Sequence, residues 1–215
     1  SGYASLSFGG GGQPSMKDFA RRRDGNPRWK RVVDIMIALA ALVFCAPLML
    51  LAAVLARVDG GPSLFVNKRP GYGNQQIGVL KFRSMRVNAE EHLAALLSSD
   101  PEAAEEFRRT AKLKSDPRIT PIGRFLRASS LDELPQLINV LRGDMSIVGP
   151  RPRTYPEMDW APQYPQFDAY FKVRPGITGL WQVSGRSDTD YAKRVELDAE
   201  YVEGMSFYND MKILA

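Results

Sequence analysis

The sequence predicts an α+β fold, mostly helical with short strands, whose N-terminal part associates with a membrane. Three observations lead to this prediction. Residues 35–58 form an apolar run in which Arg57 is the first charged side chain. Two β-like runs, 63–67 and 76–82, flank a Pro-Gly-Tyr-Gly turn. Further along the chain, apolar residues recur at helical spacing, at Leu134, Leu137, Ile138 and Leu141.

Composition excludes several classes of function. The 215 residues suffice for one domain plus an appendage. One cysteine excludes a disulfide framework and a cysteine zinc site, and one histidine excludes a histidine-rich metal site. The 29 Lys and Arg against 24 Asp and Glu give a net charge of +5. This surplus suggests phosphate-bearing partners: nucleotides, nucleic acid or anionic lipid.

The chain begins with residues 1–27, which we expect to be a flexible tail because its first part is rich in Ser and Gly. The apolar run then extends roughly 36 Å if helical, enough to cross a hydrocarbon core of about 30 Å. Pro47 would interrupt such a span, and both flanks are basic, which the positive-inside rule places on one side. A plain span and a re-entrant hairpin both remain open, and a buried core helix is a third alternative.

The remaining elements follow from local signals. Residues 88–114 predict a charged pair of helices broken at Asp100-Pro101, and Gly143 marks the end of the helix that contains Leu134. We expect strands at 145–148 and 177–183, and a helix at 190–203 capped by Asp188 or Thr189.

The most informative segment reads Ser-Ser-Leu-Asp-Glu-Leu-Pro-Gln, from residue 129 to 136. Proline is tolerated in the first turn of a helix, so Pro135 places Asp132 and Glu133 at a helix N-terminus. There the free N–H groups and the positive end of the dipole favour carboxylates, phosphates and metal–phosphate assemblies. The structural alternative is a capping box formed by Ser130 and Glu133.

Many basic side chains occur in neighbouring segments. Guanidinium groups bind phosphate oxygens in pairs, so a lone acidic pair among arginines suits a diphosphate ligand. For any one of them, a solvated surface role or a lipid headgroup contact is the alternative. No spacing typical of a Walker or dinucleotide-binding loop occurs. The candidates are Lys81, Arg83, Arg124, Arg127, Arg151, Arg153, Arg174 and Arg186.

Long stretches of the chain resemble the bacterial sugar transferase family, the monotopic phosphoglycosyl transferases that start cell-surface glycan assembly. The resemblance covers about residues 28–214. It rests on residues 115–127 and 131–152, together with Lys-Phe-Arg-Ser-Met at 81–85, the glycine-rich stretch 173–186 and Lys-Arg-Val-Val-Asp at 30–34.

This resemblance implies a re-entrant helix-break-helix at residues 28–60, broken at Pro47, and a cytoplasmic catalytic domain at residues 61–215. It places the protein at the cytoplasmic face of the bacterial inner membrane. Family members often carry Ser-Pro at the break, whereas this chain has Ala46 before the proline, which puts the side-chain contribution to the break in doubt.

The resemblance also implies a reaction. A sugar-1-phosphate would pass from a UDP-sugar to undecaprenyl phosphate, or another polyprenyl phosphate, through a covalent phosphosugar–aspartyl intermediate with release of UMP. This is the first membrane step of exopolysaccharide biosynthesis. Asp132 would be the nucleophile, and Glu133 would help Asp132 hold Mg²⁺ or receive the proton of the acceptor. The implied phosphate contacts are Arg127 and Arg151 first, then Lys81, Arg83 and Arg153.

The implied partners are the UDP-sugar, the lipid acceptor and membrane lipid, with no nucleic acid and with the choice between a monomer and a homo-oligomer open. Residues 88–114 resemble the insertion of exopolysaccharide-initiating members, which favours a hexose donor, although the sugar itself stays open. The alternative function is a non-enzymatic single-span anchor with a basic module that binds nucleic acid or anionic lipid. That alternative does not explain an acidic pair set among arginines, and it predicts no release of UMP.

Overall fold

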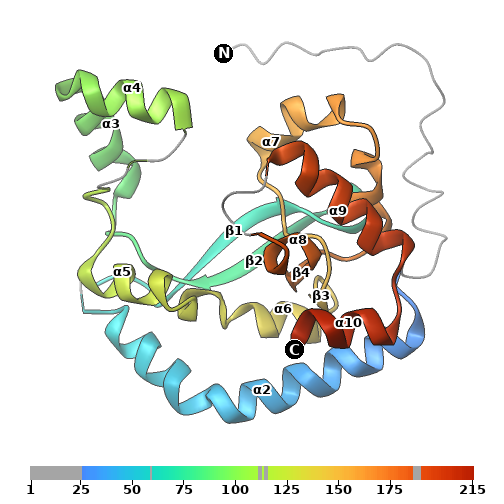
Figure 1. Ribbon diagram of the computed structural model, residues 1–215. Coiled ribbons are helices and arrows are strands. Elements are labelled where there is room, and N and C mark those ends of the chain that lie inside the picture. The colour runs from blue at the N-terminus through green and yellow to red at the C-terminus, as the bar shows by residue number, and fades with distance from the viewer. Residues whose placement is uncertain (1–25, 59, 111–112, 114–115, 186–189) are drawn as a thin grey trace.

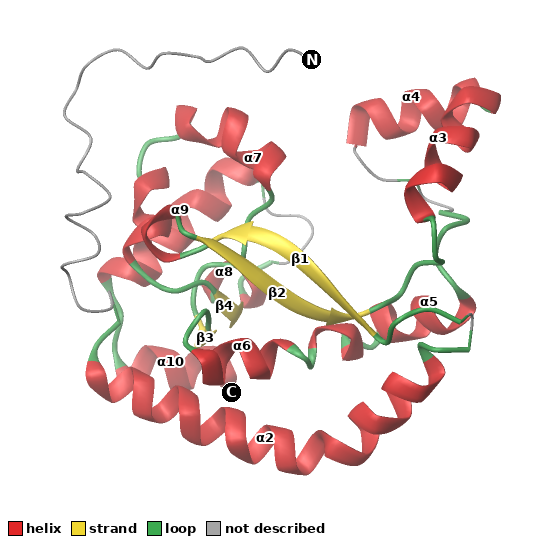
Figure 2. Ribbon diagram, turned by 180° about the vertical axis from the view of Figure 1, so that it is seen from behind, coloured by secondary structure: helices red, strands yellow, loops and turns green. Residues whose placement is uncertain are grey.

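The N-terminal apolar segment forms one long helix. The computed structural model describes residues 26–58, 60–110, 113, 116–185 and 190–215. Helix α2 spans Arg28–Leu55 and contains Pro47. The expected helix-break-helix is therefore one continuous helix, which bends along its length (Figures 1 and 2). A proline removes one hydrogen bond, here to the carbonyl of Val43, and leaves the neighbouring bonds of the ladder intact.

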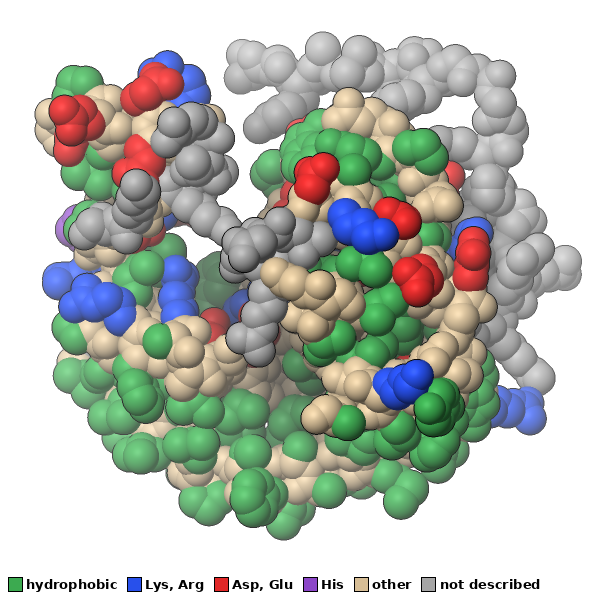
Figure 3. All heavy atoms as spheres, viewed as in Figure 1, with side chains coloured by type: hydrophobic (Ala, Val, Ile, Leu, Met, Phe, Trp, Pro, Cys, Tyr) green, Lys and Arg blue, Asp and Glu red, His purple; other side chains and the backbone are tan. Residues whose placement is uncertain are grey.

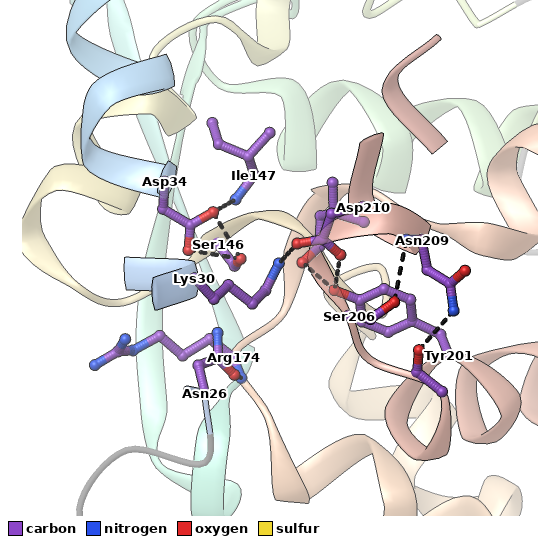
Figure 4. Close-up of polar contacts among 12 residues, drawn as sticks. Asn26, Lys30, Asp34, Ser146, Ile147, Arg174, Tyr201, Ser206, Asn209 and Asp210 are labelled. Atoms are coloured by element: carbon purple, nitrogen blue, oxygen red, sulfur yellow. Dashed lines mark hydrogen bonds and ion pairs between the residues drawn. The ribbon is translucent and has the colours of Figure 1, made fainter. Parts of the chain in front are cut away.

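Charged side chains fasten the first turns of α2 to the rest of the chain (Figure 4). Lys30 Nζ lies 2.5 Å from Asp210 Oδ2 of helix α10 (Phe207–Leu214). Asp34 accepts hydrogen bonds from Ser146 Oγ at 2.8 Å and from the backbone N–H of Ile147 at 2.9 Å. A buried charge is tolerated only when it is paired or hydrogen-bonded, so these contacts fix where α2 meets the domain.

The folded part begins earlier than predicted. Asn26 is buried, and its side-chain oxygen accepts a hydrogen bond from the backbone N–H of Arg174 at 3.3 Å. Residues 26 and 27 therefore do not belong to the expected tail, whose other residues, 1–25, lie outside the described part of the chain.

The outward face of α2 is apolar and exposed. Of its most apolar window, 11% is buried inside the protein, so α2 is not the core helix of a globular domain. Within the described residues, α2 is the helix that is long and apolar enough to cross a membrane. Figure 3 shows the resulting band of hydrophobic side chains along the lower edge of the molecule. It includes Val32, Met36, Leu39, Val43, Phe44, Leu51 and Val54.

Two small sheets support the site. Strands β1 (Leu64–Pro70) and β2 (Gln76–Phe82) pair antiparallel, with Phe65 opposite Lys81. Strands β3 (Ser146–Val148) and β4 (Gly176–Thr178) pair parallel. These strands confirm the predicted β runs, except that the strand expected at 177–183 ends at Thr178. Residues 180–183 form helix α8 instead, with Gly179 as its N-cap. Gly179 packs closely on the turn after β3, where a Cβ atom would lie 2.3 Å from the carbonyl oxygen of Gly149.

The predicted helix pair stands apart from the body of the molecule in both ribbon views (Figures 1 and 2). Helix α3 spans Ala89–Ser99 and helix α4 spans Pro101–Thr110. The predicted break at Asp100 is confirmed, and Asp100 caps α4 by accepting hydrogen bonds from the backbone N–H groups of residues 102 and 103, both at 3.0 Å.

The other helices surround the two sheets. The predicted helix at 190–203 is confirmed as α9, while its expected caps, Asp188 and Thr189, lie outside the described residues. The largest hydrophobic cluster joins Ala38 of α2, Val79 of β2 and Ile147 of β3. The helices are α5 (Pro121–Ala128), α6 (Gln136–Arg142), α7 (Tyr155–Trp160), α8 (Leu180–Val183) and α9 (Tyr191–Glu203), with 3₁₀ turns η1 (Tyr72–Asn74), η2 (Leu131–Glu133), η3 (Ala161–Gln163) and η4 (Phe167–Lys172).

Candidate active site

Asp132 and Glu133 lie in the 3₁₀ turn η2, immediately before helix α6. Pro135 is the N-cap of α6 and Gly143, with φ 92°, is its C-cap, so the predicted end of the helix is confirmed. The helix begins at Gln136, and Leu134, which was expected inside it, is the C-cap of η2. The capping-box alternative is wrong. Ser130 has φ 57° and its side chain makes no capping hydrogen bond, and the carboxylate of Glu133 accepts from Lys81 instead of from the backbone of Ser130.

A buried amide docks α6 onto the β-hairpin. Asn139 is fully buried; its side chain donates to the carbonyl of Gly78 at 2.7 Å and accepts from the backbone N–H of Leu80 at 2.9 Å. These contacts satisfy the free edge of β2 as a further strand would. Because η2 precedes α6 directly, Asn139 also sets the position of the acidic pair. The sequence analysis missed this residue, whose only signal is a polar side chain on the apolar face of a helix.

Two basic side chains meet at Glu133. Lys81 Nζ donates to Glu133 Oε1 at 2.7 Å and lies 3.8 Å from Asp132 Oδ2. Arg151 Nη2 donates to the same oxygen of Glu133 at 3.1 Å. The structure thus brings together four of the predicted site residues, which are up to 70 positions apart in the sequence.

The surroundings affect the two carboxyl groups differently. Burial raises the pKa of Asp132, and Glu133 adds to this rise, while Lys81 and Arg127 oppose it. Burial alone would also raise the pKa of Glu133, but Arg151 and Lys81 hold it below its usual value. Glu133 is therefore firmly ionised, whereas Asp132 is a buried carboxyl whose ionised form gains stability from any further cation.

The turn that carries Arg151 is positioned by close backbone contacts with the start of β4. It follows Gly149 and Pro150 after β3, and the backbone N–H of Gly176 donates to the carbonyl of Pro150 at 2.8 Å. A Cβ atom on Gly176 would lie 2.1 Å from the backbone nitrogen of Gly149, so a side chain there would force the strands apart. The glycine-rich stretch at 174–179 thus supports the turn that carries Arg151.

Arg127 projects from α5 near the acidic pair. Its Nε donates to Ser84 Oγ at 2.8 Å, its side chain is exposed, and its charge lowers the pKa of Asp132. Helix α5 lies close to the strand end because Gly123 packs on Ser84, where a Cβ atom would meet the Ser84 carbonyl at 1.9 Å. Arg127 therefore has both the position and the freedom to meet an anion beside Asp132.

Arg83 and Arg153 differ from the prediction. Arg83 donates to the backbone carbonyls of Ala56 at 2.6 Å and Pro62 at 2.7 Å, which joins the end of α2 to β2. Arg153 is buried, with its guanidinium paired to Asp198 and enclosed by the ring of Tyr191 among others. Both arginines stabilise the fold at these positions: the contacts described here join Arg83 to the end of α2 and Arg153 to α9.

An apolar groove runs between α2 and the domain. Its volume is about 650 Å³. One wall is formed by the second half of α2, and the other includes Leu64, Phe82, Pro135 and Ile138. Because Pro135 lies two residues after Glu133, the groove passes next to the acidic pair.

The acidic pair suits a magnesium ion held jointly with a ligand. Within the described residues, no group of three or more His, Cys, Asp and Glu side chains is arranged to hold a metal. Mg²⁺ is commonly bound through one or two carboxylates plus substrate phosphates and water. Asp132 and Glu133 supply two such carboxylates, and the raised pKa of Asp132 is consistent with a site that gains from a cation.

The fold and the site together define a class of protein: a membrane-associated domain whose buried acidic pair lies among basic side chains and next to an apolar helix. Comparison with known proteins identifies the family. The model of the bacterial sugar transferase family matches residues 25–215, so the chain belongs to this family.

Three relatives with assigned names are 39–47% identical to this chain over the aligned residues. The chain is 47% identical to "Undecaprenyl-phosphate galactose phosphotransferase" of Salmonella typhimurium over 86% of this chain and 38% of that protein. It is 46% identical to "Exopolysaccharide production protein ExoY" of Sinorhizobium fredii over 86% of this chain and 81% of that protein. It is 39% identical to "UDP-glucose:undecaprenyl-phosphate glucose-1-phosphate transferase" of Caulobacter vibrioides over 86% of this chain and 66% of that protein. The chain thus spans about two fifths of the Salmonella protein and most of the Sinorhizobium protein.

Proposed function

We propose that this protein transfers a sugar-1-phosphate from a UDP-sugar to a polyprenyl phosphate, with undecaprenyl phosphate as the expected acceptor. The observation that carries this proposal is the buried Asp132 beside Glu133, Lys81 and Arg151, next to the apolar groove of α2. Relatives are named as galactose and glucose phosphotransferases, so UDP-galactose and UDP-glucose are the first donors to test.

In the proposed first step, a carboxylate oxygen of Asp132 attacks the phosphorus bonded to the sugar. A bond forms between that oxygen and the phosphorus, the bond to the bridging oxygen breaks, and UMP leaves with the bridging oxygen. In the second step, an oxygen of the polyprenyl phosphate attacks the same phosphorus. The diphosphate bond forms, and Asp132 is released as a carboxylate.

The basic side chains would stabilise the charge that develops on the phosphate oxygens. Arg127 is exposed and Arg151 is 42% exposed in its side chain, so both are able to turn toward a bound diphosphate. Lys81, at 3.8 Å from Asp132, favours the ionised form of the nucleophile against the effect of burial. Mg²⁺ bound at Asp132 and Glu133 would supply further masking of negative charge. The lowered pKa of Glu133 favours the cation-holding role over the proton-accepting one.

We infer that α2 enters and leaves the same leaflet. Both ends of this helix pack on the same domain: Lys30 and Asp34 at the first end, and Ala52 with Phe82 and Leu126 at the second. A straight span would place these two ends on opposite sides of the membrane. The re-entrant arrangement keeps the domain on one side, which the basic flanks assign to the cytoplasmic face.

The apolar groove would receive the acceptor. Its α2 wall lies in the hydrocarbon region in this arrangement, and its other wall includes Pro135, two residues after Glu133. A polyprenyl chain in this groove would bring its phosphate to Asp132 without leaving the membrane. The nucleotide sugar would reach the same phosphorus from the aqueous side.

The test is release of UMP by the purified protein in lipid with Mg²⁺, undecaprenyl phosphate and a panel of UDP-sugars. We expect one donor to yield UMP, and Asp132→Asn to reduce the rate by at least about 10⁴-fold, because the amide cannot form the acyl phosphate. Asp159→Asn, at an exposed position of α7, is the matched control and should retain the full rate. Residual turnover by Asp132→Asn would remove Asp132 from the nucleophilic role.

A further inference from the structure

Arg69 is a cation near the site that the sequence analysis did not single out. It lies on β1 opposite Ile77, and Phe65 lies opposite Lys81 on the same pair of strands. Residues that face each other across an antiparallel pair, and residues four apart along a strand, project from one face. Arg69 therefore shares the face of the hairpin from which Lys81 reaches Glu133.

Hydrogen bonds bring this end of β1 beside the turn that carries Arg151. The hydroxyl of Tyr170 donates to the carbonyl of Pro70 at 2.6 Å and accepts from the backbone N–H of Arg153 at 3.2 Å. One buried tyrosine thus links the residue after Arg69 to the second residue after Arg151.

The guanidinium of Arg69 is partly buried and makes no hydrogen bond or ion pair with any residue in the described part of the chain. Burial lowers its pKa, as does the nearby charge of Arg151, while Glu157, Tyr170 and Glu133 act in the opposite direction. A partly buried cation without a hydrogen-bonded partner is costly, and an anionic ligand would compensate this cost.

We propose that Arg69 binds a phosphate oxygen of the nucleotide-sugar donor. This inference rests on the proposed function and assigns the donor to one side of the acidic pair. The acceptor groove includes Leu64, at the other end of β1. Leu64 and Arg69 are five positions apart along the strand, which corresponds to about 17 Å. The donor's diphosphate would lie along Lys81, Arg151 and Arg69, while the acceptor phosphate arrives from the groove.

The test measures donor affinity directly. Binding of UDP-galactose and UDP-glucose to the full chain in lipid nanodiscs is titrated by calorimetry for the wild type and for Arg69→Gln, Arg69→Lys and Lys68→Gln. We expect Arg69→Gln to weaken binding by about 10- to 100-fold, as for the loss of a charge-assisted hydrogen bond, and Arg69→Lys to weaken it less. Lys68→Gln removes the same charge from the exposed, opposite face and should change affinity less than about twofold.

Three further measurements separate the alternatives. The melting temperature of Arg69→Gln should not fall below that of the wild type, because the guanidinium has no hydrogen-bonded partner to lose and its partial burial is costly. If Arg69 served only to neutralise Glu157, then adding Glu157→Gln to Arg69→Gln would restore the donor affinity of the wild type, and that result would overturn the proposal. If Arg69→Gln instead raised the KM for polyprenyl phosphate and left donor affinity unchanged, the donor assignment would be wrong.

Failure of the proposed function is distinguishable from failure of this inference. If the wild-type protein bound no UDP-sugar, both the proposed function and the role of Arg69 would be wrong. A wild type that binds its donor, with Arg69→Gln indistinguishable from Lys68→Gln, would remove only the role of Arg69.

Discussion

Arg151 and Arg153 are two positions apart in one Pro-flanked turn, and the structure gives them different roles. Arg151 is partly exposed and donates to Glu133, whereas Arg153 is buried against Asp198. Both side chains are arginines in the same motif, so nothing local distinguishes a ligand-binding guanidinium from a structural one. The distinction comes from α9, which brings Asp198 to Arg153 from 45 positions away.

The Arg153 assignment predicts a loss of stability rather than of affinity. Arg153→Met would leave the buried carboxylate of Asp198 without its partner, so we expect the free energy of unfolding to fall by about 3–5 kcal/mol. Chemical denaturation in detergent measures this change. Arg153→Met combined with Asp198→Leu should recover part of the loss, since no buried charge then remains.

Arg151→Met is the comparison at the neighbouring position. It should change stability by less than about 1 kcal/mol, because its side chain is 42% exposed, and it should lower the rate of UMP release. If Arg153→Met instead left stability unchanged and weakened donor binding, Arg153 would be a phosphate-binding residue after all.

At the scale of the element, helix α2 combines two different surfaces. Its first turns carry Lys30 and Asp34 into the domain, and the following turns expose a continuous apolar face. The helix contains Pro47 and bends along its length, and both of its ends contact the domain. A helix without this bend would keep one of the two contacts and lose the other.

Pro47→Leu tests this account of α2. Leucine restores the missing N–H and favours a straight helix by up to about 3 kcal/mol, so we expect a fraction of the molecules to adopt a full span. Protease added outside sealed vesicles would then cut the two flanks of α2 to different extents. Leu48→Ala, which leaves the proline in place, serves as the control. Equal cleavage of both flanks in Pro47→Leu, as in the wild type, would show that the bend does not depend on the proline.

At the scale of the whole molecule, α2 runs along one edge of the domain, and the arm formed by α3 and α4 projects away from the body near α5 (Figure 1). Helix α2 is joined to the domain by the buried ion pair of Lys30 with Asp210, whereas α3 has no buried residue. The base of the arm is closed by a bridge between Met85 and Ile119, and the backbone N–H of Arg86 donates to the carbonyl of Arg118 at 2.8 Å. The body of the molecule therefore does not require the arm for its packing.

Removal of the arm should leave the body folded. Replacing residues 88–114 with a Gly-Ser linker of roughly six residues preserves the closed base and shortens the loop, so we expect the free energy of unfolding to change by no more than about 1 kcal/mol. Thermal unfolding in nanodiscs measures this, with the wild type as reference. A protein that loses its cooperative transition would show that the arm takes part in the core.

The local features of this protein are determined by the sequence alone. The apolar helix, the proline within it, the β-hairpin, the helix pair broken at Asp100 and the acidic pair before α6 all follow from residues within a few positions of each other. Their physical causes, such as periodicity, turn chemistry and capping, act over one or two turns of chain, so a single sequence is enough to predict them.

The tertiary structure alone decided which side chains meet. Lys81 and Arg151 contact Glu133, Arg83 and Arg153 stabilise the fold, and Asn139 completes the edge of β2. Each of these contacts joins residues from different elements, and each depends on the packing of several others. Long-range pairings of this kind leave no periodic trace in the chain, because burial and charge compensation are properties of the assembled fold.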